Sequence, residues 1–200
     1  MRRQQHLLVR VFGQLFLSFF GFATVFGTPP AKAASSPVTI GGPFTLTAVD
    51  GETVTDRTYR GRWLLVYFGY TSCPETCPTV LNAIGVALDK LGPDAKRVQP
   101  LFITVDPQRD TPEVMGKYIN AFDSRIVGLT GSPQQIETVV QEYGAYSAPH
   151  DVGGGETTLM DHSTYIYLMS AEGKFVKAFD ANTPGDHLAQ EIRKLVAQTS

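Results

Sequence analysis

The 200-residue sequence has only two cysteines, Cys73 and Cys77, and this scarcity excludes two classes of protein. A disulfide-dense scaffold needs several bridges, whereas two cysteines can form one. A zinc site built entirely of cysteine within one chain needs four thiolates. The two sulfurs must therefore act with each other or with ligands of another kind.

An excess of charge of either sign is also missing. The formal net charge is −2, which gives no reason to expect a nucleic acid as a partner. Hydrophobic residues make up 42% of the chain and charged residues 18%, so a packed core can form and wholesale disorder is excluded. The length suits one ordinary domain and is too short for two.

The sequence also lacks an apolar run of the roughly 20 residues that a membrane-spanning helix prefers. A basic start through Arg10 leads into the uncharged segment 11–26, and the small-x-small site Ala31-Lys32-Ala33 follows. These are the parts of a secretory signal, and we expect residues 1–33 to be a cleaved signal or, alternatively, an N-terminal membrane anchor. Residues 34–200 then form a domain that is periplasmic, or anchored and facing outward from the cytoplasmic membrane, where disulfides persist.

Strand and helix patterns alternate through the rest of the chain. Segments 44–49 and 53–55 predict an N-terminal β-hairpin, and continuous apolar runs such as 63–68 predict strands buried on both faces. Further strands are expected at 101–105, 126–129, 164–169 and 174–179, and helices are expected after Cys77, Thr111, Ser132 and Thr183. The order indicates a single three-layer α/β domain.

The Cys73–Cys77 pair follows a buried strand and opens a helix, at the sheet edge where α/β proteins place their sites. The spacing puts both sulfurs on one helix face, near enough for a disulfide after slight adjustment, and the helix N-terminus favours the thiolate. A bridge closing so short a loop would stabilise the fold by only about 2 kcal/mol in the chain-entropy model. The pair therefore indicates redox chemistry or metal binding rather than a structural bridge.

The positions of the four histidines in the sequence indicate which of them could be metal ligands. His6 lies in the N-terminal segment, and His187 lies in the first turn of the last helix, where we expect it to be solvated. His150 lies in the loop 146–159 and is a candidate secondary ligand. His162 stands immediately before a buried strand, at the place where thioredoxin-like proteins keep a proline that faces the cysteine pair.

His162 has two interpretations. It could be a core histidine that is hydrogen-bonded to Asp161, or it could complete a metal site with the two cysteines. Two thiolates and one imidazole suit monovalent copper, which accepts three-coordinate sites, whereas zinc would want a fourth ligand. Divalent copper is the alternative oxidation state. Asp161 and Asp106 are candidates for a carboxylate that does not bind the metal itself but orients the ligating histidine by a hydrogen bond.

Four segments of the chain together form a pattern that is specific to one protein family, although no single segment is. They are 61–71, 73–78, 105–112 and 161–163. With them the chain resembles the Sco/SenC family of copper-binding thioredoxin-like proteins over residues 38–198. The resemblance implies a thioredoxin-like fold with an added hairpin and copper binding by Cys73, Cys77 and His162. It also implies a role in assembling the binuclear copper centre of cytochrome c oxidase. The Gly- and Thr-rich loop 146–159 departs from the family pattern.

Two functions stay open at this point. A copper chaperone would bind the ion, dock on the copper-bearing subunit of cytochrome c oxidase or another copper-handling protein, and hand the ion over by ligand exchange. A thiol-disulfide oxidoreductase would use a redox-active Cys73–Cys77 disulfide, one thiolate attacking a partner disulfide and the other resolving the mixed intermediate. His162 separates the two, because disulfide exchange has little need of an imidazole there. A thiol peroxidase has less support, since Arg109 is expected to pair with Asp106 or Asp110.

Overall fold

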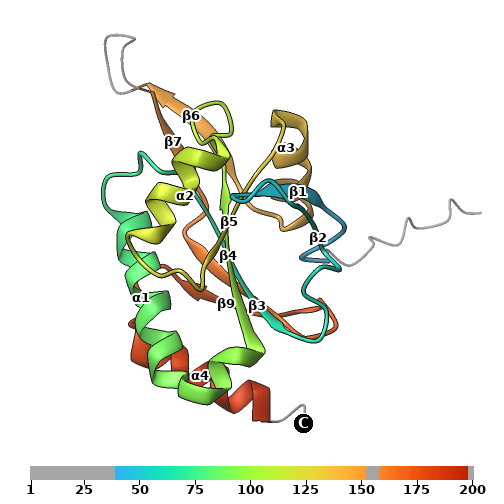
Figure 1. Ribbon diagram of the computed structural model, residues 1–200, viewed down its shortest axis with the longest axis vertical. Helices are drawn as coiled ribbons and strands as arrows, with labels where there is room; N and C mark the ends of the chain where they lie inside the picture. Colours follow the sequence, from blue (N-terminus) through green and yellow to red (C-terminus); the bar gives the residue numbers. More distant parts are fainter. Residues whose placement is uncertain (1–38, 152–157, 198–200) are drawn as a thin grey trace, which may run out of the picture. The chain divides into compact units, whose positions relative to one another are not determined.

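The computed structural model describes residues 39–151 and 158–197 of the chain (Figure 1). Within these residues a central sheet is formed by β1 (Thr45–Ala48), β2 (Thr53–Thr55), β3 (Trp63–Gly69), β4 (Val98–Thr104), β5 (Val127–Thr130), β8 (Tyr165–Met169) and β9 (Phe175–Asp180). The strand order is β2-β1-β5-β4-β3-β8-β9. β3, β4 and β5 run parallel, and β8 is antiparallel to β3. Each strand that the sequence predicted is present.

The two innermost parallel strands are completely covered. Every residue of β3 and β4 is buried, which explains the continuous apolar runs that predicted them. β4 begins at Val98, earlier than the expected segment 101–105, because Gln99 and Pro100 interrupt the apolar run. The Gln99 side-chain amide donates to the Arg125 carbonyl at 3.0 Å, a partner that the local sequence does not reveal.

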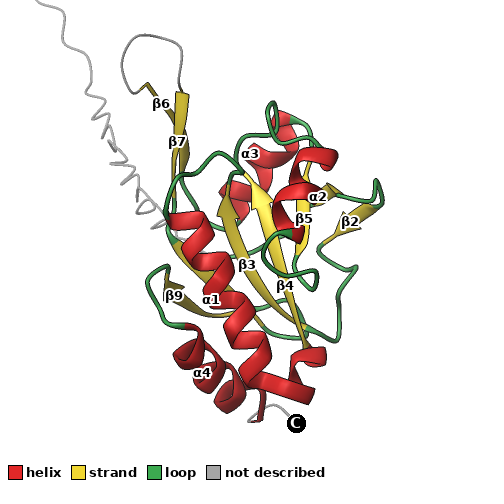
Figure 2. Cartoon of the chain, turned by 60° about the vertical axis from the view of Figure 1, so that its left-hand side comes forward, coloured by secondary structure: helices red, strands yellow, loops and turns green. Residues whose placement is uncertain are grey.

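Helices cover both faces of the sheet (Figure 2). They are α1 (Thr76–Leu91), α2 (Pro112–Asn120), α3 (Pro133–Glu142), α4 (Gly185–Ala197) and a short 3-10 helix, η1 (Gly92–Arg97), which the sequence did not predict. Successive residues of β3 point to opposite faces. Tyr67 points toward α1, where its hydroxyl contacts Cys77, and Phe68 packs edge-on against Tyr143 at the end of α3. α4 packs along α1.

Local capping explains where the helices begin. As predicted, Thr111 caps α2, and Ser132 forms a capping box with Gln135 at the start of α3. α1 has no side-chain cap at the residue preceding it. The Cys73 sulfur instead accepts the Cys77 backbone N–H at 3.4 Å, which places a sulfur at the positive end of the helix dipole.

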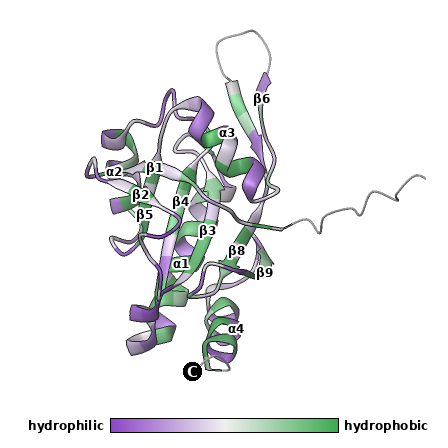
Figure 3. Cartoon of the chain, turned by 90° about the vertical axis from the view of Figure 1, so that its right-hand side faces the viewer, coloured by the Kyte–Doolittle hydropathy of each residue, from purple (hydrophilic) through white to green (hydrophobic). Residues whose placement is uncertain are grey.

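Hydropathy follows these layers. Figure 3 shows hydrophobic residues along β3, β4 and β8 in the interior and hydrophilic residues on the outer sides of the helices. In the part of the chain that the structure describes, no helix combines the length and the apolar character needed to cross a bilayer. Residues 1–33, expected to be a signal or an anchor, lie outside the described residues.

A separate two-stranded sheet takes up the two ends of the expected loop 146–159. It pairs β6 (Ser147–Asp151) with β7 (Thr158–His162) in antiparallel register. The expectation of a loop is therefore wrong for residues 147–151 and 158–159, and residues 152–157 lie outside the described part of the chain. β6 has no fully buried residue, so the apolar alternation that reveals half-buried strands is missing from its sequence. The hairpin stands beside the first turn of α1 and carries His162 at its end (Figure 2).

Candidate metal centre

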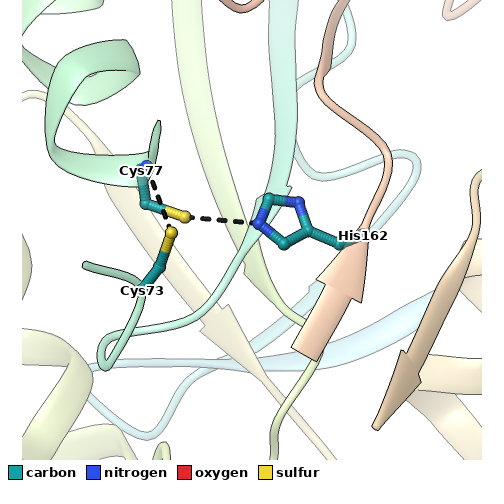
Figure 4. A group of neighbouring side chains, drawn as sticks. All are labelled: Cys73, Cys77 and His162. Carbon is teal, nitrogen blue, oxygen red and sulfur yellow. Dashed lines mark hydrogen bonds between the residues drawn. The ribbon is translucent and has the colours of Figure 1, made fainter. Parts of the chain in front are cut away.

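Three separate elements bring Cys73, Cys77 and His162 together (Figure 4). Cys73 lies in the loop after β3, Cys77 in the first turn of α1, and His162 at the end of β7. Their ligand atoms all lie within 4.8 Å of one another. Cys77 Sγ is 3.7 Å from His162 Nε2. Two sulfurs and one ring nitrogen thus converge at a single point.

The site is closed on one side and accessible on the other. Cys77 is fully buried, Cys73 is 8% exposed, and His162 is half-buried. Gly69 provides the space for the buried sulfur, because a Cβ there would lie 2.7 Å from Cys77 Sγ and 2.7 Å from Phe102 Cε2. A partner or an ion therefore reaches the site from the side of Cys73 and His162.

A buried carboxylate fixes the loop that carries the first cysteine. Asp110 is fully buried and lies in the segment between β4 and α2. Its two oxygens accept hydrogen bonds from the Thr71 N–H at 3.0 Å, the Thr71 hydroxyl at 2.6 Å and the Thr104 hydroxyl at 2.6 Å. Thr71 precedes Cys73 by two residues. Asp110 therefore ties the cysteine loop to the end of β4.

The two thiols have opposite protonation tendencies. A hydrogen bond from the Cys77 thiol, assisted by the His162 ring, lowers the pKa of Cys73 to about 4 despite partial burial. The hydrogen bond to Cys73 and complete burial raise the pKa of Cys77 above its ordinary range. Without a metal the pair therefore holds one thiolate, at Cys73, stabilised by one thiol. No disulfide joins the two cysteines in the structure.

This asymmetry predicts the pH dependence of alkylation in the reduced protein. The rate at which iodoacetamide modifies Cys73 should rise through an inflection near pH 4 rather than near the ordinary thiol value of about 8.5, because the thiolate is the nucleophile. Since the folded pKa lies below the unfolded one, the ionised thiol contributes stability that is complete above about pH 8.5. That contribution is lost as the pH falls toward 4.

Mass spectrometry of the modified peptide would follow the rate at each pH. Cys77 serves as the internal control, since its raised pKa and burial should leave it unmodified while the protein is folded. An inflection of Cys73 near pH 8 would contradict the assigned asymmetry.

The two acidic residues expected to orient His162 do not contact it. His162 Nδ1 lies 3.0 Å from the Ser163 carbonyl oxygen. Asp161 is exposed, and its carboxylate lies 3.6 Å from His150 Nδ1. Neighbouring residues of a strand point to opposite faces, so Asp161 faces away from the side of the hairpin that presents His162. Asp106 bonds to Arg109, the pairing that the sequence predicted.

The other two histidines that the structure describes lie away from the three converging residues. His150 contacts Asp161, and the register of the hairpin places both on the face opposite His162. His187 is exposed at the start of α4, as expected. His6 lies outside the described residues.

Sequence reasoning missed three residues that shape the site: Asp110, Tyr67 and Tyr70. Asp110 was considered only as a partner of Arg109. Tyr67 donates its hydroxyl to Cys77 Sγ at 3.9 Å, and its ring meets the His162 ring edge-on. The sequence offered only one signal for the tyrosines, their position within the ten residues before Cys77. Tyr67 lies on the buried strand β3 and Tyr70 directly follows it, so both are expected simply to be core residues.

Comparisons with known proteins agree with the fold. The SCO1/SenC family model matches residues 32–197. Bradyrhizobium japonicum ScoI, solved with copper bound, is 41% identical with a TM-score of 0.72, over 78% of this chain and 98% of that one. Yeast Sco1 with copper bound is 37% identical with a TM-score of 0.72, over 80% and 89%. The implied thioredoxin-like α/β fold is confirmed.

Relatives found by sequence point the same way. Protein SenC of Rhodobacter capsulatus is 39% identical over 158 residues, 79% of this chain and 71% of that protein. The human mitochondrial SCO1 homologue is 37% identical over 76% of this chain and 52% of its own length. The chain spans about half the length of several curated relatives, namely 56%, 50% and 52% of three of them. The chain belongs to the SCO1/SenC family.

Proposed function

We propose that this protein is a copper chaperone that holds monovalent copper between Cys73, Cys77 and His162. The convergence of two sulfurs and one imidazole nitrogen within 4.8 Å of one another carries the proposal. Thiolates are soft ligands that select monovalent copper, and a three-ligand set satisfies that ion. Within residues 39–151 and 158–197 no carboxylate or further histidine joins the cluster, so a closed tetrahedral zinc site has no fourth ligand there.

Copper-bound relatives support the choice of metal. The Bradyrhizobium protein, yeast Sco1 and an Arabidopsis relative that is 39% identical were all solved with copper bound. Another matched structure is described as a member of the Sco family of cytochrome c oxidase assembly proteins. We infer that the acceptor is a copper-bearing subunit of that oxidase, and that the ion passes to it by ligand exchange at the accessible Cys73 side.

A thiol-disulfide oxidoreductase is the second candidate, favoured by the lowered pKa of Cys73. In that reaction the Cys73 thiolate attacks one sulfur of a partner disulfide and expels the other as a thiolate. Cys77 then attacks the mixed disulfide. The products are a Cys73–Cys77 disulfide and a reduced partner, so two electrons pass to the partner. The two functions are chemically linked, because only the reduced pair can bind copper.

We also propose that the domain works outside the cytoplasm, delivered or anchored by residues 1–33. The basic, apolar and small-residue pattern of that segment supports this location. The chaperone would then meet its acceptor on the outer side of the cytoplasmic membrane.

The decisive experiment is an anaerobic titration of the reduced protein with monovalent copper against a competing chelator. The wild type should take up one tight equivalent. His162→Ala should bind roughly 10- to 100-fold more weakly, since even the loss of an outer partner of a metal ligand has an effect of that size. His187→Ala, which changes an exposed histidine of α4, should match the wild type.

The same variants distinguish the two candidates. Exchange with glutathione disulfide, measured at pH 9 where the reactive thiol is largely ionised in every variant, should be nearly unchanged in His162→Ala. If His162→Ala binds copper as tightly as the wild type, the copper-site assignment fails and the oxidoreductase becomes the leading function.

A further inference from the structure

The third ligand belongs to an element that is not part of the central sheet. β7 pairs with β6 alone among the described strands. Two hydrogen bonds close the base of this hairpin, from the Ser163 N–H to the Tyr146 carbonyl at 3.0 Å and from the Tyr146 N–H to the Ser163 hydroxyl at 2.8 Å. Both bonds are internal to the segment. They do not fix His162 relative to the cysteines, which lie on α1 and on the loop before it.

Two tyrosines from the cysteine-bearing part of the fold contact the His162 ring. Tyr67 of β3 meets it with ring centroids 6.0 Å apart and planes at 80°. Tyr70, in the loop before Cys73, meets it at 5.8 Å and 86°. Both are edge-to-face contacts, the arrangement that aromatic rings prefer. Both tyrosines are buried, at 0% and 2% exposure, so their own positions are set by the core.

Tyr67 also contacts one of the thiols. Its hydroxyl donates to Cys77 Sγ at 3.9 Å, so this one side chain touches two of the three converging residues. The Ser163 carbonyl at 3.0 Å from Nδ1 defines which side of the imidazole faces away from the sulfurs. The tyrosines therefore limit where the His162 ring can lie, and the Ser163 carbonyl limits how the ring can rotate.

We propose that Tyr67 and Tyr70 are positioning residues that hold the His162 imidazole at the two sulfurs before an ion arrives. This inference rests on the proposed copper site and adds to it the reason why a ligand on a separate hairpin is already in place. Preorganisation removes the cost of ordering the ring on binding. The tyrosines act through His162, and no contact with the ion is assigned to them.

A double-mutant cycle with His162→Ala tests this. Tyr70→Leu should weaken monovalent copper binding by roughly three- to tenfold, the equivalent of one edge-to-face pair. In the His162→Ala background the same substitution should have almost no effect, because the ring on which it acts is gone. Tyr70→Phe keeps the ring but removes the hydroxyl that bonds to the Met160 backbone of β7, so its loss of affinity should be smaller than that of Tyr70→Leu. Tyr67→Leu also removes the hydroxyl that donates to Cys77 Sγ, so part of its loss should remain in the His162→Ala background.

Tyr143→Leu is the matched control. Tyr143 is also a buried tyrosine with edge-on ring contacts, to Phe68 and Tyr167, but it packs on the opposite face of the sheet. It should lower thermal stability and leave copper affinity unchanged. In the metal-free protein, the NMR shift of the His162 ring Cε1 proton should move toward its free value in Tyr70→Leu and stay in place in Tyr143→Leu.

The outcomes separate the inference from the function on which it rests. A loss in Tyr70→Leu that is equally large in both backgrounds, or no loss at all, overturns the positioning role while leaving the copper site intact. If His162→Ala itself has no effect on affinity, the copper site and the positioning role fall together. A loss confined to the background that contains His162 supports the inference.

Discussion

Replacing Cys77 with Ser should abolish tight binding of monovalent copper, with an affinity loss greater than about 100-fold. The serine hydroxyl is a hard donor that stays protonated, so it replaces neither the softness nor the charge of a thiolate. Cys77 is fully buried beside Gly69, and the sequence has no third cysteine to supply another thiolate. Cys73→Ser should show a loss of the same order.

Competition with a chelator of known affinity under anaerobic conditions would measure this loss. Thr79→Ala is a suitable control, because Thr79 lies in the same helical turn but is exposed, and its hydroxyl donates to the Glu75 carbonyl. Retention of binding within tenfold of the wild type in either serine variant would rule out the two-thiolate site.

The second large effect concerns stability. Asp110→Ala should lower the free energy of unfolding by about 3 to 5 kcal/mol, since buried donors left without an acceptor cost roughly 1 to 3 kcal/mol each. The donors are the Thr71 N–H and the hydroxyls of Thr71 and Thr104. A loss of this size is a large fraction of the 5 to 15 kcal/mol that a typical domain has.

Urea unfolding of the reduced, metal-free protein would measure the change. Asp161→Ala removes an exposed carboxylate whose partner is His150, and it should change stability by less than about 0.5 kcal/mol. Asp110→Asn should recover only part of the stability lost in Asp110→Ala. The asparagine amide nitrogen is a donor, and it would face the N–H and hydroxyl groups that donate to the carboxylate. An Asp110→Ala effect below 1 kcal/mol would show that water satisfies the freed groups.

The sequence allowed the central sheet and the helix starts to be predicted because their signals are local. The apolar run 63–68 requires a strand buried on both faces, and Thr111 and Ser132 have capping side chains within a few residues of the helices they begin. The β6–β7 hairpin has no comparable signal. Its strands are short and partly exposed, and its register is defined by pairing rather than by burial.

The candidate site divides in the same way. The cysteines and His162 could be named from spacing and from the family resemblance, and the structure brings them together. The role of Asp110 could not be predicted, because its partner Thr71 is 39 positions away. Asp161 was misassigned for a related reason: as a neighbour of His162 in sequence it looked like a partner, but strand alternation turns neighbours to opposite sides.

The distance along the chain between the ligands has a mechanical consequence. Cys77 and His162 are 85 positions apart, so an ion held by both would close a long loop in the way a disulfide does, but reversibly. An ion that binds only the folded arrangement also stabilises it by mass action. The cargo would then serve as a removable cross-link between the hairpin and α1, and handing it over would leave His162 held by its tyrosine contacts alone.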